Sequence, residues 1–457
     1  MPGLNLHCQS EKKQIEMKKT LLIFIVLLLC GPGKAVFPMY DASVQADTVA
    51  LPSDSPAWFG QGALRMDLIL AGNQQRTSAY LDELYHEPYW SGSPSSMIDS
   101  LGFGSFRVKV FRQATGGLVY SNGFGTLFQE WQTTPEARAI GRAFDQVVRM
   151  PFPAEKVRVE ILERMRDGSF SSVMDLEVDP NSMFIRRNHF TPYPVTRVAG
   201  NGDPAHSLDL VFVAEGYLEG QMEKFRSDVR DMAEYILSQQ PFDSYRDHIN
   251  FWAVESPSPA EGPSNPGQGF YNRTPAGTTY YSLGLDRYLT TARHGQLMDA
   301  AANAPGDVVC VLVNTTQYGG GGIYNAHIVG TADHPWSKVV FIHEIGHGLA
   351  GLGDEYFGSE VAYEDFYPLD VEPWEANLTT LVDFESKWKD LLDDDIPVPT
   401  PAEESYLDRL GVFEGGGYTS EGVYRPYIHC RMRSNTAPGF CPVCQKTISR
   451  VIETYIR

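Results

Sequence analysis

The chain is poor in basic residues and has no long apolar run. Its 457 residues include 37 Lys and Arg against 57 Asp and Glu, a formal net charge of −20, and no basic tract interrupts this balance. Nucleic acid is therefore not an expected partner, because a phosphate backbone is held by clusters of cationic side chains. No apolar run reaches the roughly 20 residues that a transmembrane helix needs.

The remaining composition is that of a folded protein with many turns. Hydrophobic residues make up 42% and charged residues 21% of the chain, which excludes a disordered or fibrous protein. The 42 Gly and 30 Pro are spread without a period, so we expect turns rather than long helical bundles. The length favours two or three domains of β-rich or mixed architecture.

The first 35 residues show the pattern of an export signal. Lys18 and Lys19 precede the short apolar run 21–29, and small residues follow as far as Ala35. Because residues 1–16 are polar, we expect translation to begin at Met17. The segment 1–35 is thus predicted to be a signal region, and residues 36–57 a leader into the first domain.

Cys30 raises the question of a lipid anchor. It follows three leucines, which resembles the lipobox of bacterial lipoproteins, although that motif has a small residue where Leu29 stands. Two alternatives stay open: an outer-surface lipoprotein anchored at Cys30, or a secreted or periplasmic protein.

Residues 58–195 are expected to form an antiparallel β-sandwich. Apolar and polar residues alternate in short stretches such as 106–111 and 157–162, and Gly, Pro, Asn and Asp separate these stretches. Several such strands within one domain favour two packed sheets. We find no catalytic constellation in this region.

Residues 205–457 are predicted to form a mixed α/β domain, which makes the whole chain an α+β multidomain protein. A turn-rich linker at 197–204 precedes it. The expected elements are a buried strand at 208–214, a helix at 220–239, a helix at 286–303 and a buried strand at 307–314.

An HExxH motif lies on an apolar helical segment of this domain. His343 and His347 are four residues apart, so both imidazoles can reach one metal ion from the same face of a helix. Neutral imidazoles suit zinc, and a zinc-bound water has a pKa lowered to about 7. Glu344 is then the expected general base that takes a proton from this water and passes it to the leaving amine.

A third ligand is expected just after the helix. Gly351 and Gly353 allow the chain to turn back, and the adjacent carboxylates Asp354 and Glu355 follow. Asp354 is the preferred ligand. Glu355 is the alternative, because neighbouring residues of an extended segment point to opposite sides and the sequence alone does not say which side faces the metal. The carboxylate that does not bind the metal is expected to orient a histidine.

These motifs, in this order, resemble a known family. The string HExxHxxxGLGDEY at 343–356, the glycine run at 319–322, the segment 411–418 and the closing 430–433 together are similar to the bacterial IgA-peptidase family of zinc metallopeptidases. The resemblance covers about residues 205–457, and the preceding domain is similar to that family's N-terminal domain. It implies an exported zinc endopeptidase that acts on IgA or on another host or mucosal protein.

The same family is similar to metzincins, which adds two expectations. Metzincins carry HExxHxxGxxH/D, and one inserted residue brings Asp354 to the position of the third ligand. Met432 then resembles the residue of the Met-turn, an apolar floor beneath the metal and not a ligand.

Metzincin-like enzymes also bind substrate as an added strand, so the glycine run is expected at the rim of the substrate cleft. The residues expected at this rim are Tyr318, Gly319, Gly320 and Gly321.

The cysteines that follow the signal region admit several interpretations. Cys430 is closest in sequence to Cys441 and Cys444, and an exported protein favours a disulfide. A structural zinc ion is the alternative, with His429 and Cys430 completing the CxxC pair. Cys310 has no partner nearby in sequence.

The predicted function is peptide-bond hydrolysis by one zinc ion. The alternative is a surface binding or adhesion protein with a degenerate metalloprotease domain. It is disfavoured because each residue that the HExxH chemistry requires is present.

Overall fold

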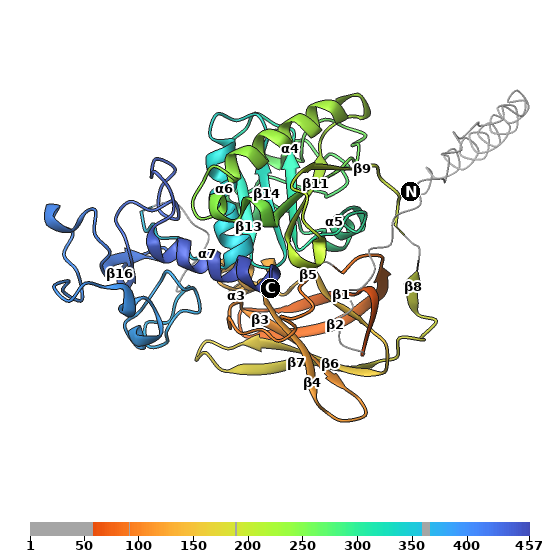
Figure 1. Cartoon of the computed structure of the whole chain (residues 1–457), viewed down its shortest axis with the longest axis horizontal. Coiled ribbons are helices and arrows are strands. Elements are labelled where there is room, and N and C mark those ends of the chain that lie inside the picture. The colour runs from red at the N-terminus through yellow and green to blue at the C-terminus, as the bar shows by residue number, and fades with distance from the viewer. Residues whose placement is uncertain (1–57, 91, 188–189, 359–365) are drawn as a thin grey trace, which may run out of the picture. The chain divides into compact units, whose positions relative to one another are not determined.

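The computed structural model describes residues 58–90, 92–187, 190–358 and 366–457 (Figure 1). The predicted signal region 1–35 with Cys30, and the leader 36–57, lie outside the described residues. Among the residues that are described, no helix is both long and apolar enough to cross a membrane.

The N-terminal part of the described chain contains two four-stranded sheets. The first, in the order β5-β1-β2-β8, comprises β1 (Phe59–Asn73), β2 (Arg76–Glu87), β5 (Arg142–Pro153) and β8 (Ile185–Arg187). The second, in the order β4-β3-β6-β7, comprises β3 (Phe106–Arg112), β4 (Leu118–Phe124), β6 (Val157–Arg164) and β7 (Phe170–Val178). The short helices α2 (Leu127–Gln132) and α3 (Pro135–Ala139) connect β4 to β5. Neighbouring strands are antiparallel, except that β8 runs parallel to β2.

Alternating sequence explains how both sheets share one hydrophobic core. In β3 the buried residues Phe106, Val108 and Val110 alternate with more exposed ones, and β6 repeats this pattern with Val159 and Ile161. These side chains belong to the same core cluster as those of β1 and β5. The strands predicted at 106–111 and 157–162 are therefore confirmed.

The C-terminal part contains a six-stranded mixed sheet in the order β13-β14-β12-β10-β11-β9. Its strands are β9 (Val195–Ala199), β10 (Leu208–Glu215), β11 (Ile249–Val254), β12 (Val308–Val313), β13 (Gly320–Ile323) and β14 (His327–Thr331). The four central strands are parallel, and the edge strands β9 and β13 are antiparallel to their neighbours. The helices are α4 (Met222–Ile236), α5 (His294–Ala301), α6 (Ser337–Ala350) and α7 (Pro442–Tyr455).

Strand β10 shows how the sheet separates two cores. All of its residues are buried, as is typical of a central parallel strand. Leu210 and Phe212 contribute to the core that α4, α6 and α7 cover. Val211 and Val213 point to the opposite face and pack with residues of α5. The sheet is thus covered on both faces by helices.

The predicted strands at 208–214 and 307–314 and the helix at 220–239 correspond to β10, β12 and α4. The helix predicted at 286–303 begins only at His294, because the preceding residues form β-bridges, Tyr288 with Gly320 and Thr290 with Thr279. The first residues of the predicted linker, 197–199, end β9, which pairs with β11.

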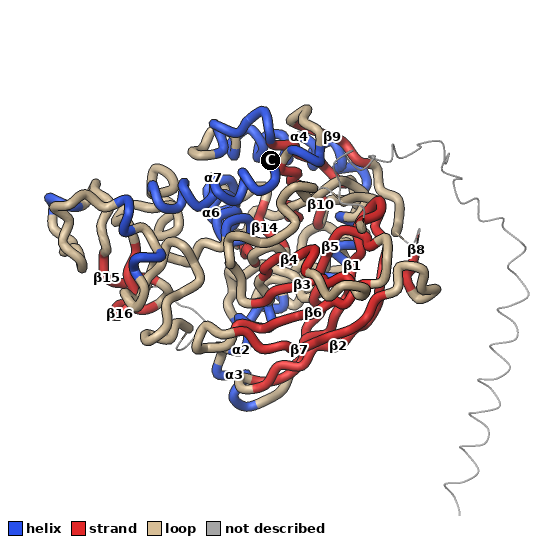
Figure 2. The backbone as a smooth tube through the Cα atoms, turned by 60° about the horizontal axis from the view of Figure 1, so that its bottom comes forward, coloured by secondary structure: helices blue, strands red, loops and turns tan. Residues whose placement is uncertain are grey.

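The described residues between α6 and α7 are mostly irregular, as Figure 2 shows around β15 (Phe413–Gly416) and β16 (Thr419–Arg425). Short 3-10 helices occur along the domain at Pro204–His206, Glu219–Gln221, Phe242–His248, Pro266–Gln268, Ser282–Gly284, Phe384–Ser386, Lys389–Leu391 and Glu404–Tyr406.

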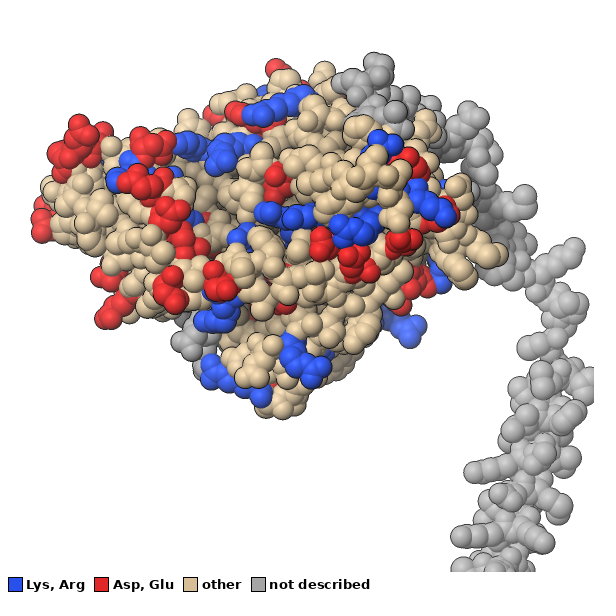
Figure 3. All heavy atoms as spheres, turned by 90° about the horizontal axis from the view of Figure 1, so that it is seen from below, with Lys and Arg blue, Asp and Glu red and all other residues tan. Residues whose placement is uncertain are grey.

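Acidic side chains gather at the end of the molecule that carries β15 and β16 (Figure 3). Asp393, Asp394 and Asp395 form an exposed acidic run, in which Asp393 and Asp395 pair with Arg409.

Candidate active site

Helix α6 brings the two histidines of the HExxH motif together. The Nε2 atoms of His343 and His347 are 3.0 Å apart. The helix ends because Gly351 adopts the left-handed conformation, with φ of 58°, and its N–H closes back on the last turn. This reversal returns the chain toward the histidine face of the helix.

Asp354 lies between the two imidazoles. Its Oδ1 atom is 3.1 Å from His343 Nε2 and 3.3 Å from His347 Nε2. Ligands of a tetrahedral zinc ion at about 2.0–2.1 Å lie about 3.3 Å from one another, so the three atoms match three corners of such a site. Asp354 Oδ1 is also buried without a hydrogen-bond partner. The donor set of two nitrogens and one oxygen therefore fits a zinc ion.

Backbone carbonyl groups orient both imidazoles. His343 Nδ1 lies 3.0 Å from the carbonyl oxygen of Arg431, and His347 Nδ1 lies 2.6 Å from that of Leu352. A carbonyl can only accept, so each Nδ1 carries the proton and donates it. Each Nε2 lone pair is then directed to the common point beside Asp354, as metal binding requires.

The Asp354 carboxylate is itself held in place from the β15–β16 hairpin. Tyr418 donates its hydroxyl hydrogen to Asp354 Oδ2 at 2.7 Å, and the Gly417 N–H donates to the Asp354 carbonyl at 2.8 Å. Burial alone would raise the pKa of Asp354, but His347 and His343 outweigh burial and hold this pKa well below its ordinary value. Asp354 is therefore anionic, with one oxygen directed at the two histidines.

Glu344 lies beside the same point. One of its carboxylate oxygens is within 4.8 Å of ligand atoms of both His343 and His347. Burial raises the pKa of Glu344 above its ordinary value, even though the two histidines oppose this shift. A carboxylate with a raised pKa is a stronger proton acceptor, which suits a general base.

The glycine run allows β13 to pack directly on α6. A Cβ atom on Gly320 would lie 3.0 Å from Glu344 Oε1, and one on Gly322 would lie 2.4 Å from the Glu344 carbonyl oxygen. On the other side of the strand, a Cβ atom on Gly319 or Gly321 would lie 2.6 Å from a tyrosine ring. Close packing within the chain thus accounts for these glycines.

The outer edge of β13 is partly paired within the chain. The Leu289 N–H donates to the carbonyl of Gly320 at 3.3 Å. An added substrate strand of the kind expected from the sequence would therefore find this carbonyl already bonded. Gly319 faces the ring of Tyr280 and the carbonyl of Arg287, whereas Tyr318, Gly320 and Gly321 line the cavity above the histidines.

A cavity of about 760 Å³ lies over this site. The residues that carry chemistry along its wall are His343, Glu344, His347 and Asp354. Residues of the N-terminal part, Glu130 of α2 and Arg164 of β6, also line it. Glu130 accepts a hydrogen bond from the Tyr288 hydroxyl at 2.6 Å. Both parts of the described chain therefore contribute to one cavity.

Met432 lies against α6 at Gly346. It is fully buried, and a Cβ atom on Gly346 would lie 2.5 Å from its sulfur. Its turn is closed by the Arg433 N–H, which donates to the Cys430 carbonyl at 3.0 Å. Met432 is thus a buried apolar side chain packed on α6, and its role as the Met-turn residue stays a prediction.

Glu355 points away from the histidines. Its carboxylate accepts from Asn377 Nδ2 at 2.9 Å and lies 3.3 Å from the sulfur of Cys444. Of the two carboxylates predicted as alternatives for the third ligand, the structure brings only Asp354 to the histidine pair.

Asn377 and Tyr418 are site residues that the sequence analysis did not identify. Asn377 accepts from the Gly353 N–H at 2.8 Å and donates to the Gly353 carbonyl at 2.9 Å, which fixes the loop that carries Asp354. Neither residue belongs to a motif with a chemical meaning of its own. The segment 411–418 attracted attention only through the family resemblance, and that signal pointed to Tyr418 without giving it a role.

Two sequence profiles of known families match the chain. The profile of the IgA peptidase M64 family matches residues 196–409 and 402–452, and that of the Peptidase M64 N-terminus matches residues 56–175. No curated protein matches the chain significantly. The first profile covers more than half of the chain and includes His343, Glu344, His347 and Asp354. The chain therefore belongs to the IgA peptidase M64 family, whose members are metal-dependent peptidases.

Proposed function

We propose that this protein is an exported zinc endopeptidase, with His343, His347 and Asp354 as metal ligands and Glu344 as the general base. One observation carries the proposal. Three donor atoms lie 3.0–3.3 Å from one another, oriented by their own hydrogen-bond partners, with a buried carboxylate beside them. Three protein donors beside an open cavity are what a catalytic zinc ion would require, because such an ion would need room for a water molecule.

The chemistry divides between the ion and the protein. A bound zinc ion lowers the pKa of a coordinated water and polarises the carbonyl of the scissile bond. Glu344 accepts the proton of the attacking water at a carboxylate oxygen and donates it to the nitrogen of the leaving amine. The carbonyls of Arg431 and Leu352 keep the protons of the imidazoles on Nδ1, so neither histidine turns away during the reaction.

The substrate is proposed to be a protein, with IgA or another host or mucosal protein as the first candidates. The family's description supports this class. The cavity of about 760 Å³ is large enough for several residues of an extended peptide. Export is supported by the signal pattern that begins at Met17, and anchoring at Cys30 and free secretion stay two alternatives within the proposal.

Two finer assignments of the fold belong to this proposal. The two four-stranded sheets with a common core are typical of a β-sandwich. The long motif helix beside an antiparallel edge strand, with a buried methionine beneath the histidines, is similar to a metzincin catalytic domain.

The decisive variant is Glu344→Gln, which keeps the size of the side chain and removes the base. We expect zinc content to be unchanged and hydrolysis of a peptide library to fall by about 10²–10⁴-fold. Glu234→Gln is the matched control, because Glu234 lies exposed on α4. Retained hydrolysis in Glu344→Gln would overturn the mechanism.

A chelator experiment separates the enzyme from the binding alternative. Activity that is lost with a chelator and regained with zinc supports the endopeptidase. Capture of IgA without cleavage, by protein loaded with zinc, would support an adhesion protein instead. Cleavage of casein but not of IgA would retain the endopeptidase and reject the first candidate substrate.

A further inference from the structure

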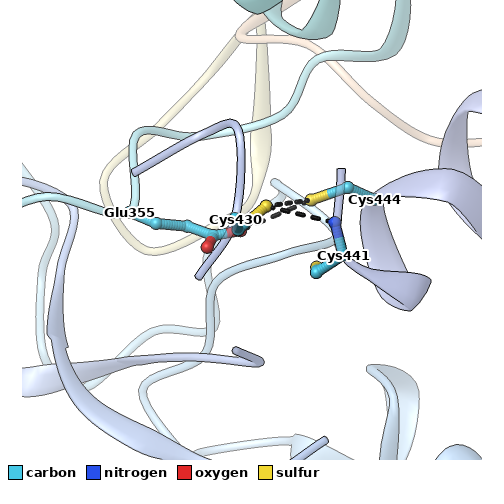
Figure 4. A group of neighbouring side chains, drawn as sticks. All are labelled: Glu355, Cys430, Cys441 and Cys444. Atoms are coloured by element: carbon cyan, nitrogen blue, oxygen red, sulfur yellow. Dashed lines mark hydrogen bonds between the residues drawn. The ribbon is translucent and has the colours of Figure 1, made fainter. Parts of the chain in front are cut away.

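Four buried side chains converge outside the catalytic cavity. They are Glu355, Cys430, Cys441 and Cys444, and one ligand atom of each lies within 4.8 Å of those of the other three (Figure 4). Cys430 directly precedes the turn that carries Met432, Cys441 is the N-cap residue of α7, Cys444 lies in the first turn of α7, and Glu355 lies in the loop after α6. Three thiols from one short stretch of sequence thus meet a carboxylate from a distant loop.

The separation of the sulfurs fits a metal ion and not a disulfide. Cys430 Sγ lies 3.7 Å from Cys444 Sγ, and none of the cysteines in the described residues is bonded to another. A disulfide requires about 2.05 Å between the sulfurs. Two thiolates bound to one zinc ion at about 2.3 Å lie about 3.8 Å from each other in a tetrahedron.

Glu355 supplies an independent sign of a ligand. The residue is fully buried, and its Oε2 atom has no hydrogen-bond partner. Its Oε1 atom accepts from Asn377 and lies beside Cys444. A buried carboxylate oxygen without a partner is costly, and a cation among the thiolates would satisfy it.

The local backbone also favours thiolates at this point. Cys441 occupies the N-cap position of α7, a helix of 14 residues with Pro442 in its first turn. The positive end of a helix stabilises a neighbouring thiolate. The Cys441 N–H donates to the sulfur of Cys430 at 3.4 Å, which further stabilises negative charge on that sulfur.

We propose that Glu355, Cys430, Cys441 and Cys444 hold a second zinc ion. Four protein ligands close its coordination shell, so this ion is structural and takes no part in hydrolysis. The sequence analysis gave two interpretations of these cysteines, a disulfide and a zinc site completed by His429. The proposed site differs from both, because the thiols bind a metal ion and the fourth ligand is Glu355 in place of the exposed His429.

This ion would fix the loops that carry the catalytic ligands. Glu355 follows Asp354 directly, and its N–H donates to the carbonyl of Met432 at 2.9 Å. Cys430 precedes Arg431, whose carbonyl orients His343. One metal ion would therefore join the loop of the third ligand, the turn beneath the histidines and the start of α7.

The test measures metal content of the purified full chain by elemental analysis. We expect two zinc ions per chain in the wild type, one in His347→Ala and one in Cys444→Ser. Cys310→Ala is the matched control, because Cys310 is buried in β12 away from the cluster, and it should retain two. One zinc ion in the wild type together with none in His347→Ala would overturn the proposal.

Cobalt substitution shows which ligands hold the ion. With cobalt, we expect thiolate charge-transfer absorption in the wild type and in His347→Ala, and its loss in Cys444→Ser. If Cys444→Ser does not fold, Glu355→Gln serves instead, and should release the thiolate-bound ion to a chelator at least tenfold faster than the wild type. An unchanged release rate, or a Cys430–Cys444 disulfide in the mass spectrum of the unreduced protein, would refute the site.

These outcomes differ from a failure of the proposed function. Loss of hydrolysis with an intact cobalt–thiolate spectrum would reject the endopeptidase and retain the second site. Hydrolysis by a protein that holds one zinc ion and has three reactive thiols would reject the second site and retain the endopeptidase.

Discussion

Replacing Tyr418 by Phe removes one hydroxyl group that orients Asp354, the proposed third metal ligand. In the structure this hydroxyl donates to Asp354 Oδ2 at 2.7 Å, and Asp354 is almost fully buried. A hydrogen bond to a charged group contributes about 1.5–3 kcal/mol. The Tyr356 hydroxyl contacts the same carboxylate and remains in the variant, which places the expected effect at the lower end of this range.

We therefore expect Tyr418→Phe to bind zinc about tenfold more weakly, as is typical when the outer partner of a ligand is removed. Competition with a chromophoric chelator measures this affinity. Tyr217→Phe is the matched control, since Tyr217 is buried and donates to Asp228 at 2.8 Å, remote from the metal ligands. Equal zinc affinity in Tyr418→Phe and wild type, or an equal loss in Tyr217→Phe, would refute the role of Tyr418.

Two further predictions concern stability. Gly322→Ala should cost about 1–3 kcal/mol and lower activity, because the new Cβ atom would lie 2.4 Å from the Glu344 carbonyl oxygen. In chemical unfolding, Gly220→Ala should have the same free energy of unfolding as the wild type, since nothing lies within 4 Å of a Cβ atom at that position. A Gly322→Ala variant as stable and as active as the wild type would contradict the packing. Burial lowers the pKa of His327 to about 4, so the neutral form is favoured in the folded protein and protonation favours unfolding. The contribution of neutral His327 to the free energy of unfolding is fully present above about pH 6.5 and declines by about 3 kcal/mol as the pH falls to about 4. In His327→Gln the free energy of unfolding should therefore depend less on pH than in the wild type. The control His206→Gln, at an exposed histidine, should keep the pH dependence of the wild type.

The site residues that lie together on one helix could be predicted from the sequence. His343, Glu344 and His347 have positions that the geometry of α6 fixes by itself. The buried strands β10 and β12 are continuous apolar runs and were likewise predictable. In each case the signal is local, and no distant residue changes its meaning.

The sequence favoured Asp354 over Glu355 as the third ligand but could not decide between them, because their orientation depends on distant residues. Adjacent residues of an extended loop point to opposite sides, and the sequence alone does not say which side faces the histidines. Tyr418 orients one carboxylate, and Cys444 and Asn377 surround the other. These partners reach the loop only through the fold.

The same limit explains the cysteines and the second predicted helix. Sequence proximity suggested a disulfide or His429 as a ligand, whereas Glu355 arrives at the cysteines from a loop far away in sequence. Residues 286–293 have apolar residues at helical spacing, yet Tyr288 and Thr290 pair with neighbouring segments as β-bridges. Tertiary pairing overrides local propensity there.

Zinc-edge anomalous diffraction from crystals of the zinc-loaded protein would test the catalytic centre most directly. We expect a peak about 2.0–2.2 Å from His343 Nε2, His347 Nε2 and Asp354 Oδ1. An absence of density at that point, or a peak bound to the histidines together with Glu355 in place of Asp354, would contradict the assignment.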